Sequence, residues 1–210
     1  GVENCAYIHL TLLPYMKKAQ ELKSKPTQHS VQDLQGLGIQ PDIIMLRSEI
    51  PIDAGTREKL ALFCNVSADC IIQNLNANSI YEVPLMMEEE GLGTVVCRVL
   101  GLEDKPPQLQ DWTAMVDKFY HPSKTIRIAL VGKYIELHDA YLSVVESLIH
   151  GGIAANVAVD IDWVDAEECR NPETTAQRLK DAHGIIVPGG FGVRGIEGMI
   201  QAAQYARTHQ

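Results

Sequence analysis

The sequence lacks the features that mark several large classes of proteins. Its 18 Lys and Arg residues are outnumbered by 27 Asp and Glu residues, which gives a formal net charge of −9. General nucleic-acid binding needs a basic surface, so this balance argues against it. The chain has no apolar run near the roughly 18 residues of a membrane span, and no signal peptide opens it. We therefore expect a cytoplasmic protein whose partners include neither nucleic acid nor membrane.

The sequence also lacks the residue spacings of a metal or thiol redox site. Its five cysteines are odd in number and widely spaced, with no CxxC pair. They are Cys5, Cys64, Cys70, Cys97 and Cys169. The histidines His29, His138 and His183 have no partner at metal-ligand or triad spacing. We expect free or buried thiols in a reducing compartment, and no metal ligands in this chain.

Short apolar runs alternate with helical patterns along the whole chain, which is typical of an α/β fold. The run at 43–46 is continuously apolar, as in parallel strands that are covered on both faces. We expect strands at 8–13, 43–46, 71–72, 126–131, 157–164 and 185–187. We expect helices after Ser30, after Asp53, and over 80–102, 112–120, 142–150, around Leu179 and over 196–206.

Specific residues predict where these helices begin, end and pack. Ser30 is expected to cap a helix that carries Leu34 and Leu37 on its apolar side and ends at Gly38. The other expected features are an Asp53 cap, a shared face of Leu60, Phe63 and Cys64, a helix end at Gly151 and Gly152, and an apolar stripe of Ile196, Met199, Ile200, Ala203 and Ala206.

The stretch 103–124 is polar and contains Pro106, Pro107 and Pro122, which indicates an interdomain linker with one docked helix. The chain therefore divides into residues 1–102, the linker at 103–124, and residues 125–210. Each flanking part is expected to hold its own parallel sheet. Because both ends of the chain fall next to apolar or helical patterns, we expect it to be a piece of a longer protein.

Residues Lys23, Ser24, Lys25, Pro26, Thr27 and Gln28 form the first motif. Pro26 favours an extended Lys25, and in an extended chain Lys23 and Lys25 point to the same side. Two converging ammonium groups could neutralise a triphosphate, while Thr27 and Gln28 could bind a sugar or a base. From composition alone, a solvated loop with two lysines remains an alternative.

A second motif, VPGGFGVRG at 187–195, follows a buried strand and precedes a helix. Glycines at the carboxyl end of a strand can present bare N–H groups to a ligand, as a phosphate site or an oxyanion hole. A tight structural turn is the alternative. A third motif, VGKY at 131–134, reads as an ordinary strand-to-helix turn.

The order of the motifs is more specific than any one of them, and it resembles CTP synthase over essentially the whole chain. The succession is HLTL at 9–12, KSKPTQH at 23–29, GIQPD at 38–42, FCNV at 63–66, SIY at 79–81, VGKY at 131–134 and VPGGFGVRG at 187–195. The resemblance implies the end of a Rossmann-like, P-loop-type synthase domain, followed by the start of a class I glutamine amidotransferase domain.

The resemblance also implies an activity and its ligands. CTP synthases are ligases that use ATP and Mg²⁺ to phosphorylate UTP, and ammonia from glutamine then displaces the phosphate to give CTP. GTP activates glutamine hydrolysis, CTP inhibits, and the enzyme is a homotetramer; filament formation is left open. A non-catalytic nucleotide-binding or filament-forming protein of the same fold is an alternative. Ligases of the cobyrinate or dethiobiotin type are disfavoured by 23–28.

Carried over residue by residue, the resemblance implies three groups of binding residues. Lys23, Ser24, Lys25, Pro26, Thr27, Gln28 and Lys59 would bind UTP or CTP, and Leu75, Asn76 and Ala77 would contact ATP. Gly190 would line the glutamine site and its oxyanion hole, and Arg194, Gly195 and Glu197 would form a lid that responds to GTP. Asn76 stands where the family commonly has Asp.

The resemblance further implies that the catalytic residues lie outside this chain. The nucleophilic Cys, with its His and Glu partners, is expected beyond Gln210, and the magnesium carboxylates before Gly1. None of the five cysteines here has the expected Gly-x-Cys-Leu-Gly setting. We therefore expect this segment alone to be inactive.

Overall fold

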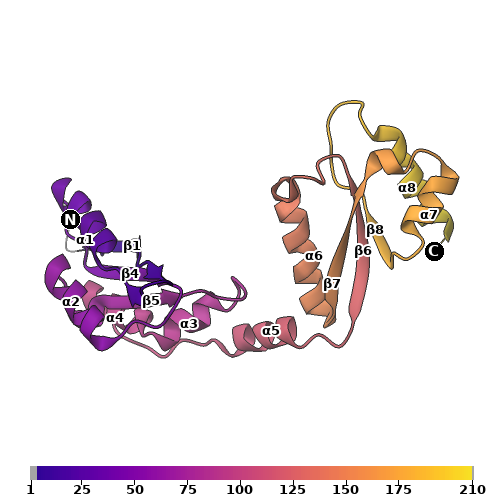
Figure 1. Ribbon diagram of the computed structural model, residues 1–210. Helices are drawn as coiled ribbons and strands as arrows, with labels where there is room; N and C mark the ends of the chain where they lie inside the picture. Colours follow the sequence, from indigo (N-terminus) through magenta and orange to yellow (C-terminus); the bar gives the residue numbers. More distant parts are fainter. Residues whose placement is uncertain (1–3, 210) are drawn as a thin grey trace. The chain divides into compact units, whose positions relative to one another are not determined.

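The computed structural model describes residues 4–209, which form two compact units, one up to Gln110 and one from Asp111 (Figure 1). Each unit is built on its own three-stranded parallel sheet. The expected α/β class with two parallel-sheet units is therefore confirmed. The finer limits at 102 and 125 stay a prediction.

The sheet of the first unit has the strand order β1-β4-β5. Its main elements are β1 (Ile8–Leu12), α1 (Lys25–Gly36), β4 (Ile43–Ser48), α2 (Ala54–Cys64), β5 (Ile71–Leu75), α3 (Val83–Glu89) and α4 (Leu92–Leu100). A short antiparallel pair, β2 (Tyr15–Met16) and β3 (Glu21–Leu22), lies between β1 and α1. A short 3-10 turn, η2 (Ala68–Cys70), leads into β5.

Both faces of the central strand β4 are covered, as the apolar run at 43–46 predicts. Ile44 and Leu46 pack with Val31 of α1 and Leu60 of α2 on one face. On the other face, Ile43 packs with residues of α3 and α4. Successive residues of a strand point to opposite faces, so a strand covered on both sides must be apolar throughout.

The second unit has the strand order β7-β6-β8. Its elements are α5 (Gln110–Tyr120), β6 (Thr125–Gly132), η3 (His138–Tyr141), α6 (Leu142–Ala155), β7 (Ala158–Asp165), η4 (Ala166–Glu168), α7 (Pro172–Leu179), β8 (Gly184–Ile186) and α8 (Ile196–His209). Side chains of β6, β7, α7 and α8 share one core, which includes Val131, Val164, Leu179 and Ala202.

Several predicted helix limits are confirmed and others are wrong. Asp53 caps α2, and its carboxylate accepts a hydrogen bond from the Thr56 N–H at 2.9 Å. Ser30 caps nothing, because α1 begins at Lys25 and continues through it. The expected helix over 80–102 is two helices, separated by Gly91 at a φ of +75°.

We expected Gly151 and Gly152 to end helix α6, but the structure shows that this prediction is wrong. The helix continues to Ala155 and ends at Asn156 in the left-handed conformation. Gly152 lacks a side chain for a different reason: a Cβ there would lie 2.7 Å from the Val157 carbonyl oxygen. The small residue lets the chain return closely along its own helix into β7.

Some predicted apolar faces are wrong as well. Leu37 is 78% exposed, Phe63 is 54% exposed and Ile200 is 52% exposed. The fully buried residues of α8 are Gly198 and Ala202, and of the predicted stripe only Met199 packs against the shared core of the second unit. This face of α8 requires small side chains because the helix packs closely on η4. A Cβ on Gly198 would lie only 1.6 Å from the Ala166 carbonyl oxygen.

Candidate functional site

Except for Lys59, which lies within α2, the predicted binding residues lie at the end of β5 or in segments that follow the strands of the two sheets. In the first unit, β1, β4 and β5 run parallel, so the segments that follow Leu12 and Leu75 leave the sheet at the same edge. In the second unit, β6, β7 and β8 likewise end at one edge. Open parallel sheets bind ligands at this edge, where loops and helix N-termini converge.

The segment from Lys23 to Gln28 is not extended, so that prediction is wrong. Ser24 has helical backbone angles, and Lys25 is already the first residue of α1. Pro26 falls in the first helical turn, where its missing N–H leaves no hydrogen bond unmade. The two lysines therefore do not converge by strand geometry, although both are exposed.

Two residues of this segment, Ser24 and Thr27, are buried and form hydrogen bonds within the first unit. Thr27 is fully buried, and its hydroxyl donates a hydrogen bond of 2.9 Å to the Leu12 carbonyl at the end of β1. Ser24 is also buried, and its hydroxyl accepts a hydrogen bond of 3.2 Å from the Gln28 amide. These contacts fix the start of α1 at the sheet edge, where Lys25 and Pro26 face solvent.

The remaining predicted lysines lie nearby in the fold. Lys23 pairs with Glu21 of β3, so part of its charge is already compensated. Lys59 is an exposed residue of α2, the helix that packs beside α1. The structure thus places Lys25 and Lys59 on neighbouring helices of the first unit.

The segment from Leu75 to Ala77 is held by Arg47, a residue of β4 that no sequence motif indicates. The Arg47 guanidinium donates to the Leu75 carbonyl at 2.8 Å and to the Asn76 side-chain oxygen at 3.0 Å. Further contacts reach the Asn74 carbonyl and side chain at 3.4 and 3.3 Å. Asn76 therefore offers Arg47 an oxygen acceptor, as an Asp at this position would.

At the edge of the second sheet, Lys133 contacts the glycine-rich segment that follows β8. Lys133 is only 4% exposed. Its ammonium donates to the Phe191 carbonyl at 2.9 Å and to the Gly192 carbonyl at 2.7 Å. Its own carbonyl accepts a hydrogen bond of 2.5 Å from Arg194. The motif VGKY is thus more than an ordinary turn, which the spacing alone did not reveal.

Gly190 lies in this turn and is exposed. A Cβ on Gly190 would lie 3.2 Å from Cε and 3.3 Å from Cδ of Lys133. These distances are tighter than ordinary van der Waals contact, so a side chain at this position would push against the lysine stem. A side chain at position 190 would therefore require the lysine stem to shift by a few tenths of an ångström.

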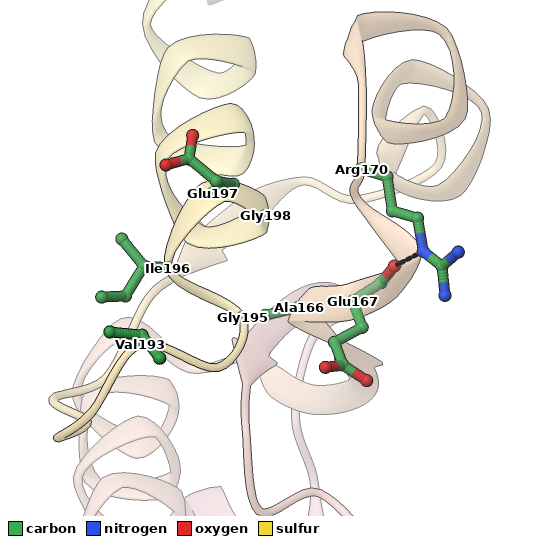
Figure 2. A pocket seen from close by; sticks show the side chains of 8 residues that line it. All are labelled: Ala166, Glu167, Arg170, Val193, Gly195, Ile196, Glu197 and Gly198. Carbon is green, nitrogen blue, oxygen red and sulfur yellow. Dashed lines mark hydrogen bonds between the residues drawn. The ribbon is translucent and has the colours of Figure 1, made fainter.

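The predicted lid residues surround the start of α8. The Arg194 guanidinium lies 6.0 Å from the Tyr134 ring centroid, within cation–π range. Gly195 has a φ of +73°, and Glu197 lies in the first turn of α8. A pocket of about 270 Å³ lies beside this segment. Figure 2 shows Val193 and Ile196 on one side of it and Glu167 and Arg170 on the other.

Three of the five cysteines are buried and are poor candidates for a nucleophile. Burial raises the pKa of the Cys64, Cys70 and Cys169 thiols, which lowers the fraction of reactive thiolate. Among residues 4–209, no group of three or more His, Cys, Asp and Glu side chains could hold a metal ion. In the same part of the chain, no helix is long and apolar enough to cross a membrane.

Comparison with family models divides the chain in the same order as its two sheets. A model described as the CTP synthase N-terminus matches residues 1–102. A model described as class I glutamine amidotransferase matches residues 136–210.

Curated relatives match the whole chain. A CTP synthase of Treponema denticola is 54% identical over 210 residues, which are 100% of this chain and 39% of that protein. A CTP synthase of Streptococcus thermophilus is 55% identical over 209 residues, with the same shares of 100% and 39%. A CTP synthase of Ruminiclostridium cellulolyticum is 54% identical over 210 residues, again covering 100% and 39%. The chain thus spans 39% of the length of each of these relatives.

Proposed function

The chain belongs to the CTP synthase family, and from this we propose that it is a segment of an enzyme that aminates UTP to CTP. The reaction would use ATP and the ammonia released from glutamine, in pyrimidine nucleotide biosynthesis. One observation carries the proposal: both family models match in the order that such an enzyme requires. The chain spans 39% of the length of these relatives, so we assign the activity to a complete enzyme of that length and not to this segment alone.

We assign UTP, and CTP as inhibitor, to the start of α1. Lys25 is exposed at the first turn of a 12-residue helix, whose N-terminal dipole favours an anion. Lys23 and Lys59 would supply further positive charge. Thr27 would act indirectly in this site, because its hydroxyl is already bonded to the Leu12 carbonyl.

We assign the base of ATP to Leu75, Asn76 and Ala77, at the carboxyl end of β5. The fit rests on their position, since Asn76 is exposed at the sheet edge while Arg47 fixes the loop. Magnesium would accompany the triphosphate. Among residues 4–209, no group of three or more His, Cys, Asp and Glu side chains could hold the ion, so its ligands would come from the rest of the enzyme.

We assign the binding side of glutamine hydrolysis to the second unit. The Gly190 N–H would donate to the oxyanion of the tetrahedral transition state, where one such donor is typically worth about 100- to 1,000-fold in turnover. Arg194, Gly195 and Glu197 would respond to GTP as a lid. The nucleophile would come from the rest of the enzyme, which we expect to be a cytoplasmic homotetramer; this segment alone would be inactive.

The proposal can be tested in a chimeric enzyme. This segment replaces the 210 matched residues of the Treponema denticola CTP synthase. We expect the chimeric enzyme to form CTP from UTP and ATP with either glutamine or ammonium chloride. A well-folded chimeric enzyme that forms CTP from neither nitrogen source would contradict the proposal.

The UTP assignment predicts the effect of Lys25→Ala in the chimeric enzyme. Losing one charge-assisted contact to phosphate removes about 1.5–3 kcal/mol, or roughly 10- to 150-fold in affinity. UTP and CTP binding should weaken together, while glutamine hydrolysis remains measurable. Lys180→Met, at an exposed position of the second unit, is the control. Unchanged affinity for both nucleotides in Lys25→Ala would rule out the assignment.

A further inference from the structure

Lys133 is a buried cation whose ammonium is bonded to carbonyl groups. Its side chain forms no ion pair among the residues that the structure describes. A buried charge is costly unless hydrogen bonds compensate for its lost hydration. The carbonyls of Phe191 and Gly192 provide two such bonds, at 2.9 and 2.7 Å. The lysine and the turn after β8 therefore stabilise one another.

The position of Lys133 is itself fixed from the other side. The Tyr141 hydroxyl oxygen accepts a hydrogen bond from the Lys133 N–H at 2.9 Å and another from the Tyr134 N–H at 3.3 Å. A Cβ on Gly132 would lie 2.6 Å from this hydroxyl oxygen, so glycine is needed for its approach. The backbone at the end of β6 is thus held in the orientation that directs Lys133 toward the turn.

Three parts of Lys133 contact the turn: the ammonium group, the aliphatic stem and the backbone carbonyl. Its ammonium bonds two carbonyls, its stem lies against Gly190, and its carbonyl accepts from Arg194. Gly192 and Gly195 have φ values of +80° and +73°, which other residues rarely adopt. A segment this rich in glycine has high conformational entropy when free. Contacts from outside are therefore what keep it in one conformation.

We propose that Lys133 is a positioning residue for glutamine hydrolysis. Its ammonium holds the 189–192 turn so that the Gly190 N–H stays aligned with the developing oxyanion. The inference rests on the proposed function. Lys133 acts through the turn, because its two bonded donors point to protein carbonyls. Loss of this alignment weakens an interaction made in the transition state, so turnover falls more than glutamine affinity.

The first experiment measures the turn in the 210-residue chain itself. Lys133→Met keeps most of the stem and removes the ammonium, while Lys180→Met is the matched control at an exposed lysine. We expect the NMR order parameters of the Gly189, Gly190 and Gly192 amides to fall from about 0.85 toward 0.6 in Lys133→Met only. Unchanged order parameters would overturn the proposed positioning.

The second experiment measures kinetics in the chimeric enzyme. Lys133→Met should lower kcat for glutamine hydrolysis at least about tenfold, with little change in KM for glutamine and none in ammonia-dependent CTP formation. A rise in KM alone, or equal loss of both activities, would overturn the positioning role.

If the proposed function were wrong, the experiments would give a different result from the one expected if only the positioning role of Lys133 were wrong. In that case the chimeric enzyme with the unaltered segment would not hydrolyse glutamine, and the NMR experiment would still decide whether Lys133 orders the turn. A change in order parameters together with unchanged kcat would show that the turn does not serve catalysis.

Discussion

Arg178 of α7 is predicted to be a main electrostatic contributor to the stability of the second unit. Its guanidinium forms two hydrogen bonds to the Asp162 carboxylate, at 2.7 and 2.9 Å. It also donates to Glu168 at 2.8 Å and to the Trp163 carbonyl at 3.0 Å. The Arg178 and Asp162 side chains are only 30% and 25% exposed. Substituting Arg178 by Met removes all four bonds while keeping much of the apolar stem.

The expected magnitude follows from burial and geometry. A hydrogen bond to a charged group contributes about 1.5–3 kcal/mol, but bonds that share one residue are not additive. We expect Arg178→Met to lower the free energy of unfolding by about 2–4 kcal/mol. The control is Arg127→Met. Arg127 of β6 forms one exposed ion pair with Asp160, which lies on β7 like Asp162. Exposed pairs contribute about 0–1 kcal/mol.

Urea unfolding followed by tryptophan fluorescence measures this difference. Both tryptophans, Trp112 and Trp163, lie in the second unit, so their fluorescence follows that unit alone. Equal destabilisation by Arg178→Met and Arg127→Met would refute the reasoning that partial burial and paired geometry decide the contribution.

The same comparison has a pH dependence with a definite sign. The hydrogen bonds from Arg178 hold the pKa of the Asp162 carboxyl below its usual value. A lowered native pKa stabilises the fold above the unfolded pKa of about 3.9, and this stabilisation is lost as the pH falls through the native pKa. The gap in unfolding free energy between the unaltered chain and Arg178→Met should therefore be constant from about pH 5 to 7 and narrow below about pH 4.

Two further predictions concern local packing and capping. Gly198→Ala should destabilise the second unit by at least about 1–3 kcal/mol in the same urea assay, because its Cβ would meet the Ala166 carbonyl oxygen at 1.6 Å. Gly151→Ala, at an open position of α6, should instead be neutral or stabilising, and the reverse order would contradict the packing argument. Asp53→Ala should speed hydrogen exchange of the Thr56 amide, which loses its acceptor; unchanged exchange would mean that another group caps α2.

The fold was predictable where local chemistry and burial agree. The apolar run at 43–46 predicts a strand covered on both faces, and Asp53 predicts a cap, because each depends on neighbouring residues. The start of α1 was not predicted because proline is compatible with two conformations. It favours an extended residue before it in a loop, but it is also common in the first turn of a helix, where Pro26 lies. The buried face of α8 was missed because close packing on η4 selects Gly198 and Ala202 over larger side chains.

The sequence motifs indicate where candidate binding residues lie along the chain, but they do not indicate which residues those side chains contact. Glycines after a strand indicate the turn at 189–192, and lysines at 23 and 25 indicate an anion site. Arg47 lies in no motif, and the motif VGKY does not by itself indicate what Lys133 contacts, since the partners of these two residues lie 28 and 58 residues away in sequence. Only the parallel order of the strands brings these partners to one edge. The available sequence signal for Lys133 was a lysine placed at the end of an apolar strand, in the motif VGKY.

The most direct test of the central assignment is a pair of rates for Gly190→Pro in the chimeric enzyme. Proline removes the N–H that would bind the oxyanion. The turn lies in the part of the chain that matches the glutamine amidotransferase model, so the substitution should not affect the synthase site directly. CTP formation is measured once with glutamine and once with ammonium chloride. We expect the glutamine-dependent rate to fall at least about 100-fold while the ammonia-dependent rate stays near that of the unaltered chimeric enzyme. Equal loss of both rates would show that Gly190 maintains the fold, and it would contradict its place in the glutamine site.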